Sequence, residues 1–167
     1  IALGNAKSAP SAKPLATLLI VAMVWSLSTS EPLYRRWVVI GLLWSTLGDV
    51  LLMLPGDYFL YGLLSFLVAH IAYLLAFNKR ERLLARLAPF AIYAVIAVGV
   101  LAYLWQGIPA PMRIPVLVYV AALGAMAAQA AAIWRIRRDR ASALAAVGGA
   151  LFMLSDSLIA FNRFGEP

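Results

Sequence analysis

GLLWSTLGDVLLML (residues 41–54) is a long apolar run with a single acidic residue, Asp49, inside it. GGALFMLSDSLIAF (residues 148–161) has the same form, with Asp156 at a similar place near its end. Each run belongs to a longer apolar segment of the kind that crosses a lipid bilayer as a helix. A carboxylate at membrane depth costs about 3 kcal/mol on insertion scales, so it is seldom found there without a function. The two runs therefore predict both a membrane fold and a chemical site.

The composition of the whole chain also indicates a membrane protein. Hydrophobic residues make up 64% of the 167 residues, charged residues make up 13%, and the mean hydropathy is +0.89. A soluble domain carries about 25% charged residues, so an ordinary soluble protein is excluded. Because there is no cysteine, disulfides and thiolate metal sites are excluded as well. We predict one integral, multi-pass domain over residues 1–167, and the alanine- and arginine-rich composition favours a bacterial inner membrane.

Apolar runs separated by turn or charge clusters predict six membrane spans. A helix needs about 20 apolar residues to cross the bilayer. The runs are continuous rather than alternating, which argues against the strands of a membrane barrel. The expected fold is therefore an all-α, polytopic transmembrane helix bundle. The predicted spans are residues 14–29, 37–54, 59–77, 87–105, 114–134 and 141–161.

The cations divide unevenly between the two sides that six alternating spans create. Four fall on one side, namely Lys7, Lys13, Arg113 and Arg163. Ten fall on the other, namely Arg35, Arg36, Lys79, Arg80, Arg82, Arg86, Arg135, Arg137, Arg138 and Arg140. The positive-inside rule places the side with ten cations in the cytoplasm. These cations set the orientation of the spans beside anionic membrane lipid, and this explains the net charge of +7. We therefore predict no nucleic-acid partner.

Asp49 and Asp156 are predicted to lie at the same depth. Each is five residues before the outer end of its span, which places it about 7 to 8 Å below the outer boundary at 1.5 Å per residue. Both spans run outward, so the two carboxyl groups can face each other if the two helices are neighbours, which we take as an expectation. A structural role is the alternative, in which each aspartate accepts hydrogen bonds or pairs with an arginine near the outer ends.

His70 and Tyr73 are two further candidates for chemistry in the third span. They are three residues apart and are expected to share a helix face, with the tyrosine hydroxyl near the imidazole. A buried neutral histidine that donates to a neighbouring carbonyl is the alternative reading. A metal held by His70 and the two aspartates is a third, but typical sites contain more imidazole or thiolate ligands. We therefore predict no metal and no cofactor.

Polar residues near the aspartates and at the outer ends of the spans are candidates for substrate binding. Ser45 lies one turn before the first aspartate, and Ser155 directly precedes the second. Arg163 can hold a phosphate through bidentate contacts, or it can simply extend to the lipid headgroups. The candidate substrate-binding residues are Lys13, Ser45, Ser155, Asn162 and Arg163.

Four segments together resemble the YhhN family of multi-pass membrane proteins, whose characterised members are lysoplasmalogenases. The segments are KPLATLLIVAMVW (13–25), GLLWSTLGDVLLML (41–54), FLYGLLSFLVAHIAYLLAF (59–77) and GALFMLSDSLIAFNRF (149–164). Their GD, AH-x-x-Y and SDS…NRF elements follow in the family's order, whereas residues 81–140 add little beyond hydropathy. The family pattern has about eight spans, with one more helix at each end, so the resemblance leads us to expect a longer chain on both sides.

The resemblance implies hydrolysis of the vinyl-ether bond of a lysoplasmalogen, a lysophospholipid, to a fatty aldehyde and a glycerophospho-base. This reaction needs an acid that is still protonated near neutral pH and a carboxylate that stabilises the oxocarbenium ion and orients water. Two carboxyl groups close together can share one proton. The resemblance thus implies that Asp49 and Asp156 are the catalytic pair, with the choice of acid left open. His70 and Tyr73 would orient groups or relay protons, and Arg163 with Lys13 would receive the phosphate.

Other classes of function remain open at the level of sequence. Carboxylates inside the membrane are equally typical of proton-coupled transporters, although no broken helix pair or inverted repeat is visible here. A metal-dependent hydrolase of another lysolipid is a second alternative, and it would be sensitive to a chelator. A lipid-binding bundle without turnover is a third. The chain contains no G-x-S-x-G element, so a serine-nucleophile lipase is not expected.

Overall fold

The computed structural model describes residues 12–26 and 31–165, and these residues form six α-helices and no strand. The helices are α1 (Ala12–Ser26), α2 (Pro32–Met53), α3 (Phe59–Arg80), α4 (Leu87–Leu104), α5 (Ala110–Arg137) and α6 (Arg140–Phe164). Each predicted span lies on one helix in the expected order, so the all-α prediction is confirmed. The five helices α2 to α6 are long and apolar enough to cross a membrane. In the first span, residues 27–29 lie outside the described part.

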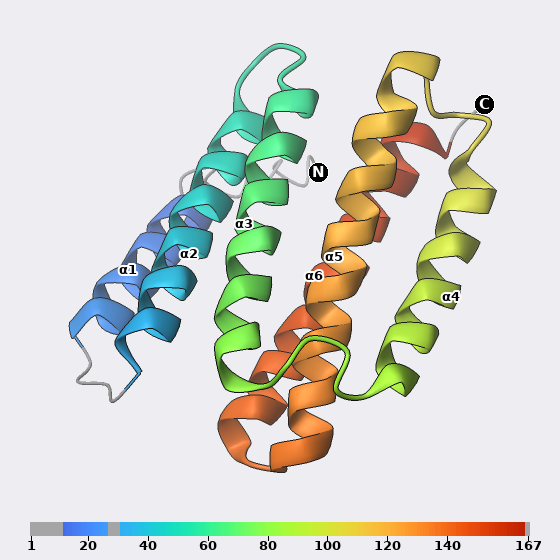
Figure 1. The fold of residues 1–167 in the computed structure, drawn as a ribbon. Coiled ribbons are helices and arrows are strands. Elements are labelled where there is room, and N and C mark those ends of the chain that lie inside the picture. Colours follow the sequence, from blue (N-terminus) through green and yellow to red (C-terminus); the bar gives the residue numbers. More distant parts are fainter. Residues whose placement is uncertain (1–11, 27–30, 166–167) are drawn as a thin grey trace, which may run out of the picture.

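The helices run alternately up and down, so the connections gather at two ends (Figure 1). The α2–α3 and α4–α5 loops lie at one end, and the α3–α4 and α5–α6 connections lie at the opposite end. Arg113 and Arg163 are therefore at the first end, which the charge pattern predicts to face outward. The basic last turns of α3 and α5 are at the other end. Lys7 lies outside the described residues.

Small residues determine which helices form the centre of the bundle. Ala69, Ala72 and Ala76 of α3 are almost completely buried, as are Ala127 and Ala130 of α5. Small side chains let two membrane helices approach closely, which explains why α3 packs against α5. The outer helices then pack around this pair, with α2 on α3 and with α4 and α6 on α5.

The second and sixth helices are not packed neighbours. Within the described part of the chain, α2 contacts α1 and α3, whereas α6 contacts α5 and α4. The expected adjacency of these two spans is therefore wrong, because α3 and α5 lie between them. Among residues 12–26 and 31–165, α1 packs on α2 and makes no contact with α6.

Ion pairs and amide hydrogen bonds join the helix ends on the predicted cytoplasmic side. Arg80 pairs with Glu31 at 3.0 Å, which links α3 to the start of α2. Arg137 of α5 pairs with Glu81 at 3.0 Å, and the buried Gln129 donates to the carbonyl of Glu81 at 2.9 Å. These contacts fix the end of α3 against α5 at the point where the chain turns toward α4.

Asp139 caps the N-terminus of α6, and its removal is expected to destabilise the protein. Its carboxylate accepts a hydrogen bond from the backbone N–H of Ser142 at 2.7 Å, which holds the pKa of Asp139 below its ordinary value. The capping contribution is thus complete above the pKa of the unfolded chain, about 3.9, and is lost as pH falls through the lower folded value. Asp139→Ala is expected to lower the melting temperature in detergent at neutral pH by a few degrees.

The matched control for this cap is Asp139→Asn, because an asparagine oxygen can accept the same hydrogen bond without a charge. This variant is expected to melt close to the wild-type temperature at neutral pH. In acid, the wild type loses further stability because its capping carboxylate is protonated, and Asp139→Asn should not show this loss. Equal melting temperatures for Asp139→Ala and the wild type would contradict the assignment.

Candidate active site

Asp49 and Asp156 line one cavity of about 400 Å³, although their helices do not touch. The cavity lies among α1, α2, α3, α5 and α6, and its walls are mostly apolar. The two carboxyl groups are close enough for their charges to interact through space. Its polar lining residues are Thr17, Ser45, Asp49, Tyr73, Ser155 and Asp156. The fold thus brings the predicted carboxylate pair together across a cavity rather than across a helix–helix contact.

Glycines on α2 bring the aromatic residues of α3 close to Asp49. A Cβ atom added at Gly48 would lie 2.7 Å from the ring of Phe66, and one added at Gly41 would overlap the ring of Tyr73. The Tyr73 hydroxyl consequently reaches the Ser45 hydroxyl at 3.3 Å, and either can donate. Tyr73 is also within electrostatic range of Asp49. One wall of the cavity therefore presents two hydroxyl groups beside a carboxyl group.

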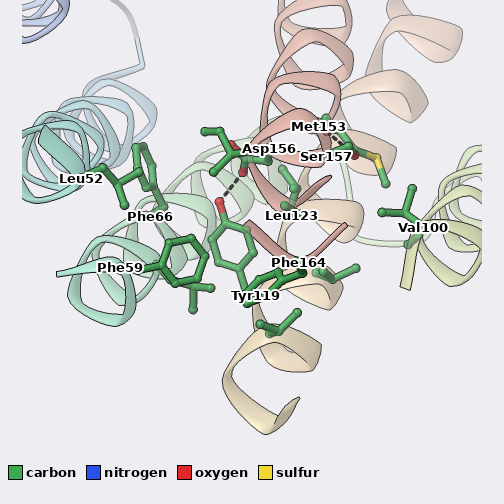
Figure 2. A pocket seen from close by; sticks show the side chains of 16 residues that line it. Leu52, Phe59, Phe66, Val100, Tyr119, Leu123, Met153, Asp156, Ser157 and Phe164 are labelled. Atoms are coloured by element: carbon green, nitrogen blue, oxygen red, sulfur yellow. Dashed lines mark hydrogen bonds between the residues drawn. The ribbon is translucent and has the colours of Figure 1, made fainter. Parts of the chain in front are cut away.

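Tyr119 of α5 is the residue that the sequence analysis missed. Its hydroxyl donates a hydrogen bond to Oδ2 of Asp156, and its ring is 8% exposed (Figure 2). A depth argument like the one used for the aspartates could have found it. Tyr119 lies nine residues from the outer end of α5, and Asp156 lies eight residues from the outer end of α6. Two polar residues at the same depth on consecutive antiparallel helices are natural partners.

Asp156 also lines a second, smaller cavity, which is shown in Figure 2. This cavity has a volume of about 80 Å³, and its walls are almost entirely apolar. Tyr119 lines only this cavity, whereas Phe66, Asp156 and Ile159 line both. One oxygen of the carboxyl group is thus bound by Tyr119, and the same side chain still borders the larger cavity.

His70 is completely buried but lines neither cavity. Its ring packs edge-on against Tyr119, with ring centres 5.3 Å apart, and against Phe152 at 4.8 Å. No hydrogen bond of good geometry joins either ring nitrogen to another described residue, but the backbone of Phe66, one turn earlier on α3, interacts with the imidazole, so donation to a carbonyl stays the alternative reading. Tyr73 faces Ser45 on α2, so His70 and Tyr73 meet different helices. His70 therefore contacts two neighbours of Asp156, namely Tyr119, which donates a hydrogen bond to Asp156, and Phe152, one turn earlier on α6.

The candidate residues at the outer end lie apart from the carboxyl groups. Arg163 pairs with the exposed Asp57 at 2.9 Å, and its guanidinium group lies 5.3 Å from the ring centre of Phe59. Asn162 is exposed in the last turn of α6. Ser155 is exposed but lines the larger cavity. Lys13 lies in the first turn of α1, and its side chain is outside the described part of the chain.

The described residues do not bring together the ligand set of a metal centre. Across residues 12–26 and 31–165, no group of three or more histidine, cysteine, aspartate or glutamate side chains could hold a metal ion. The set considered from the sequence, His70 with the two aspartates, is not assembled because the histidine faces away from the shared cavity.

Comparisons with known proteins give one family. A model described as the YhhN family matches residues 8–167. Lysoplasmalogenase of Mycobacterium tuberculosis (strain CDC 1551 / Oshkosh) is 33% identical over 175 aligned residues, which cover 96% of this chain and 62% of that protein. Lysoplasmalogenase TMEM86A of Homo sapiens is 34% identical over 134 residues, covering 78% of this chain and 55% of that protein.

A third relative is the membrane protein YhhN of Escherichia coli O157:H7. It is 26% identical over 144 residues, which cover 86% of this chain and 68% of that protein. The chain thus spans less than two thirds of the length of the mycobacterial and human relatives. No solved structure matches it. Together with five helices of membrane-spanning length, these relatives establish a multi-pass integral membrane protein.

Proposed function

This chain belongs to the YhhN family, and from that premise we propose that it hydrolyses the vinyl-ether bond of lysoplasmalogens inside the membrane. The observation that carries the proposal is the pair formed by Asp49 and Asp156 on one cavity. The names of the mycobacterial and human relatives support the same reaction. The products are a fatty aldehyde and a glycerophospho-base, and the substrate is a lysophospholipid supplied by the membrane.

Vinyl-ether hydrolysis matches what two carboxyl groups can provide. One aspartate, in its protonated form, transfers its proton to the alkene carbon that is remote from the ether oxygen. The resulting oxocarbenium ion is stabilised by the other aspartate as a carboxylate, which also takes a proton from the water that adds to the carbon beside the oxygen. As the hemiacetal breaks its bond to the glycerol oxygen, the second aspartate gives its new proton to that oxygen and the first takes the proton of the hemiacetal hydroxyl. The aldehyde and the alcohol then leave, and both carboxyl groups are back in their starting states.

The neighbouring polar residues are assigned to orientation. Ser45 and Tyr73 place two hydroxyl groups beside Asp49, where they can hold the attacking water through hydrogen bonds. Tyr119 holds one oxygen of Asp156 and so sets the direction of the other. His70 supports the Tyr119 ring and does not reach the cavity. Arg163 with Lys13 remains the proposed receiver of the phosphate, and Arg163 would have to exchange its partner Asp57 for the substrate.

The test of this function is the release of fatty aldehyde from a lysoplasmalogen by the purified protein in detergent, with and without EDTA. We expect equal release in both conditions, because a carboxylate pair needs no metal ion. Release that disappears with EDTA and returns with added metal would replace the carboxylate mechanism by a metal-dependent one. If no aldehyde forms under any condition, the proposal is wrong, and proton-coupled flux in proteoliposomes becomes the next measurement.

A further inference from the structure

The larger cavity changes character along its length. Its hydroxyl and carboxyl groups gather near Asp49 and Asp156, beside the apolar Phe66 and Ile159. Farther toward the predicted cytoplasmic end its lining residues are apolar or lack a side chain. These residues are Phe77, Met126, Ala145, Gly148, Gly149 and Phe152. A cavity that is polar at one end and apolar at the other fits an amphiphile with its reactive bond at the polar end.

From this gradient we infer that the apolar half of the cavity is the seat of the substrate's hydrocarbon chain, and that its depth limits the chain length. The inference deepens the proposed function and rests on it for the identity of the substrate. The chain would run from the two aspartates toward the cytoplasmic end of α6. The glycerol and phosphate would extend the opposite way, toward the end of α6 whose last turn contains Arg163.

The length of the apolar half agrees with this occupant. Asp156 and Ala145 are eleven residues apart on α6, which corresponds to about 16 Å along the helix axis. The hydrocarbon core of a bilayer is about 30 Å thick, so a lipid chain in one leaflet spans about 15 Å. The seat is therefore about as long as one lipid chain. The cavity of Figure 2, at about 80 Å³ against about 400 Å³, is too small for a chain of that length.

The route into the cavity that fits this occupant is lateral, between α1 and α6. Ile20 of α1 and Ile159 of α6 both border it. In the part of the chain that the structure describes, α1 packs on α2, α6 packs on α5 and α4, and no contact joins α1 to α6. A substrate in the outer leaflet already has its headgroup outward and its chain inward, so lateral entry needs no reorientation.

Gly148 is the position at which the depth of the seat can be changed. It lines the cavity, and a Cβ atom added there would meet no other atom within 4 Å. We therefore expect a large side chain at this position to occupy part of the seat, with no clash at its Cβ atom. Gly99 of α4 has equally open surroundings but does not line the cavity, and it provides the matched control.

The experiment compares Gly148→Phe and Gly99→Phe with the wild type on two vinyl-ether lysolipids, one of leaflet length and one half as long. For Gly148→Phe we expect the ratio of kcat/KM for the long substrate to that for the short one to fall by about tenfold, the effect of excluding two methylene groups. Gly99→Phe should keep the wild-type ratio. An unchanged ratio in Gly148→Phe, or an equal fall in both variants, would overturn the inference.

A binding measurement separates this inference from the proposed function. Saturated-ether lysolipids of the same two lengths cannot be hydrolysed by this chemistry, so their affinity reports only on the seat. The wild type should bind the long ether more tightly, and Gly148→Phe should lose this preference. If Gly148→Phe loses this preference but the wild type never releases aldehyde, the binding site for the hydrocarbon chain is supported and the proposed hydrolysis is wrong. If the wild type binds both lengths with the same affinity, the seat is wrong even for an active enzyme.

Discussion

Asp49→Asn and Asp156→Asn are each expected to lower kcat for aldehyde release by about a hundredfold to ten-thousandfold, the contribution of general acid–base catalysis. The two side chains border one cavity and their charges interact, so neither can replace the other. An amide has nearly the same shape as the carboxyl group, but it cannot deliver a proton to the alkene or stabilise a cation. The loss should therefore appear in kcat, with little change in the affinity for a saturated-ether lysolipid.

The control for the aspartate variants is Asp57→Asn. Asp57 is exposed in the loop between α2 and α3, pairs with Arg163 and does not line the cavity. The substitution therefore removes one carboxylate from the outer end of the protein without altering the cavity. Because Asp57 competes with the substrate phosphate for Arg163, KM is expected to fall in this variant, whereas its kcat should stay within a small factor of the wild-type value. Melting temperatures in detergent should show that both cavity variants remain folded. Full activity in either folded cavity variant would remove the carboxylate pair from the mechanism.

The membrane accounts for the part of the fold that the sequence predicted correctly. A segment inside lipid must satisfy its backbone hydrogen bonds internally, so a continuous apolar run has essentially one solution, the helix. Consecutive spans joined by short loops must then cross the membrane in opposite directions. Depth is a linear function of residue number along a straight helix, so a similar level for Asp49 and Asp156 could be predicted without knowing any contact. The predicted equal spacing is wrong in detail, because α2 ends four residues after Asp49 whereas α6 continues for eight residues after Asp156.

The lateral order of the helices could not be obtained in the same way. Hydropathy is nearly uniform around membrane helices and so carries little information on which face meets which neighbour. Here the alanines of α3 and α5 decide it, and they place this pair between α2 and α6. The expected contact of α2 with α6 failed for this reason. Both carboxyl groups still border one cavity, because α2 and α6 line it together with α1, α3 and α5.

Angular position explains why the expected pairing of His70 with Tyr73 is not formed. Residues three apart on a helix differ by about 60° in direction, since 3.6 residues make one turn. At the centre of a bundle this difference is enough to select different neighbours. His70 faces Tyr119 and Phe152, whereas Tyr73 faces Ser45. Tyr119 itself lies in a segment where the family resemblance offered no motif, so only its depth could have indicated a role.

Tyr119→Phe is expected to lower kcat by roughly ten- to hundredfold, the effect of losing one hydrogen bond to a charged group. The phenylalanine ring can keep the edge-on contacts with His70, so the packing of the bundle should be preserved. The only group removed is the hydroxyl that holds Oδ2 of Asp156. Because Tyr119 does not line the cavity shared by the aspartates, KM should change little. This split between kcat and KM identifies Tyr119 as a positioning residue that acts through Asp156.

Fluorinated tyrosines at position 119 distinguish positioning from packing. They keep the ring and the hydroxyl, but their hydroxyl groups are stronger hydrogen-bond donors, so they alter the contact with Asp156 without removing it. If Tyr119 acts through this hydrogen bond, kcat should change in step with the number of fluorine atoms while the melting temperature stays constant. A constant kcat across the series would show that Tyr119 serves packing alone. Asp156 would then be held in place by its own helix, and the contact of His70 with the Tyr119 ring would carry no influence on the reaction.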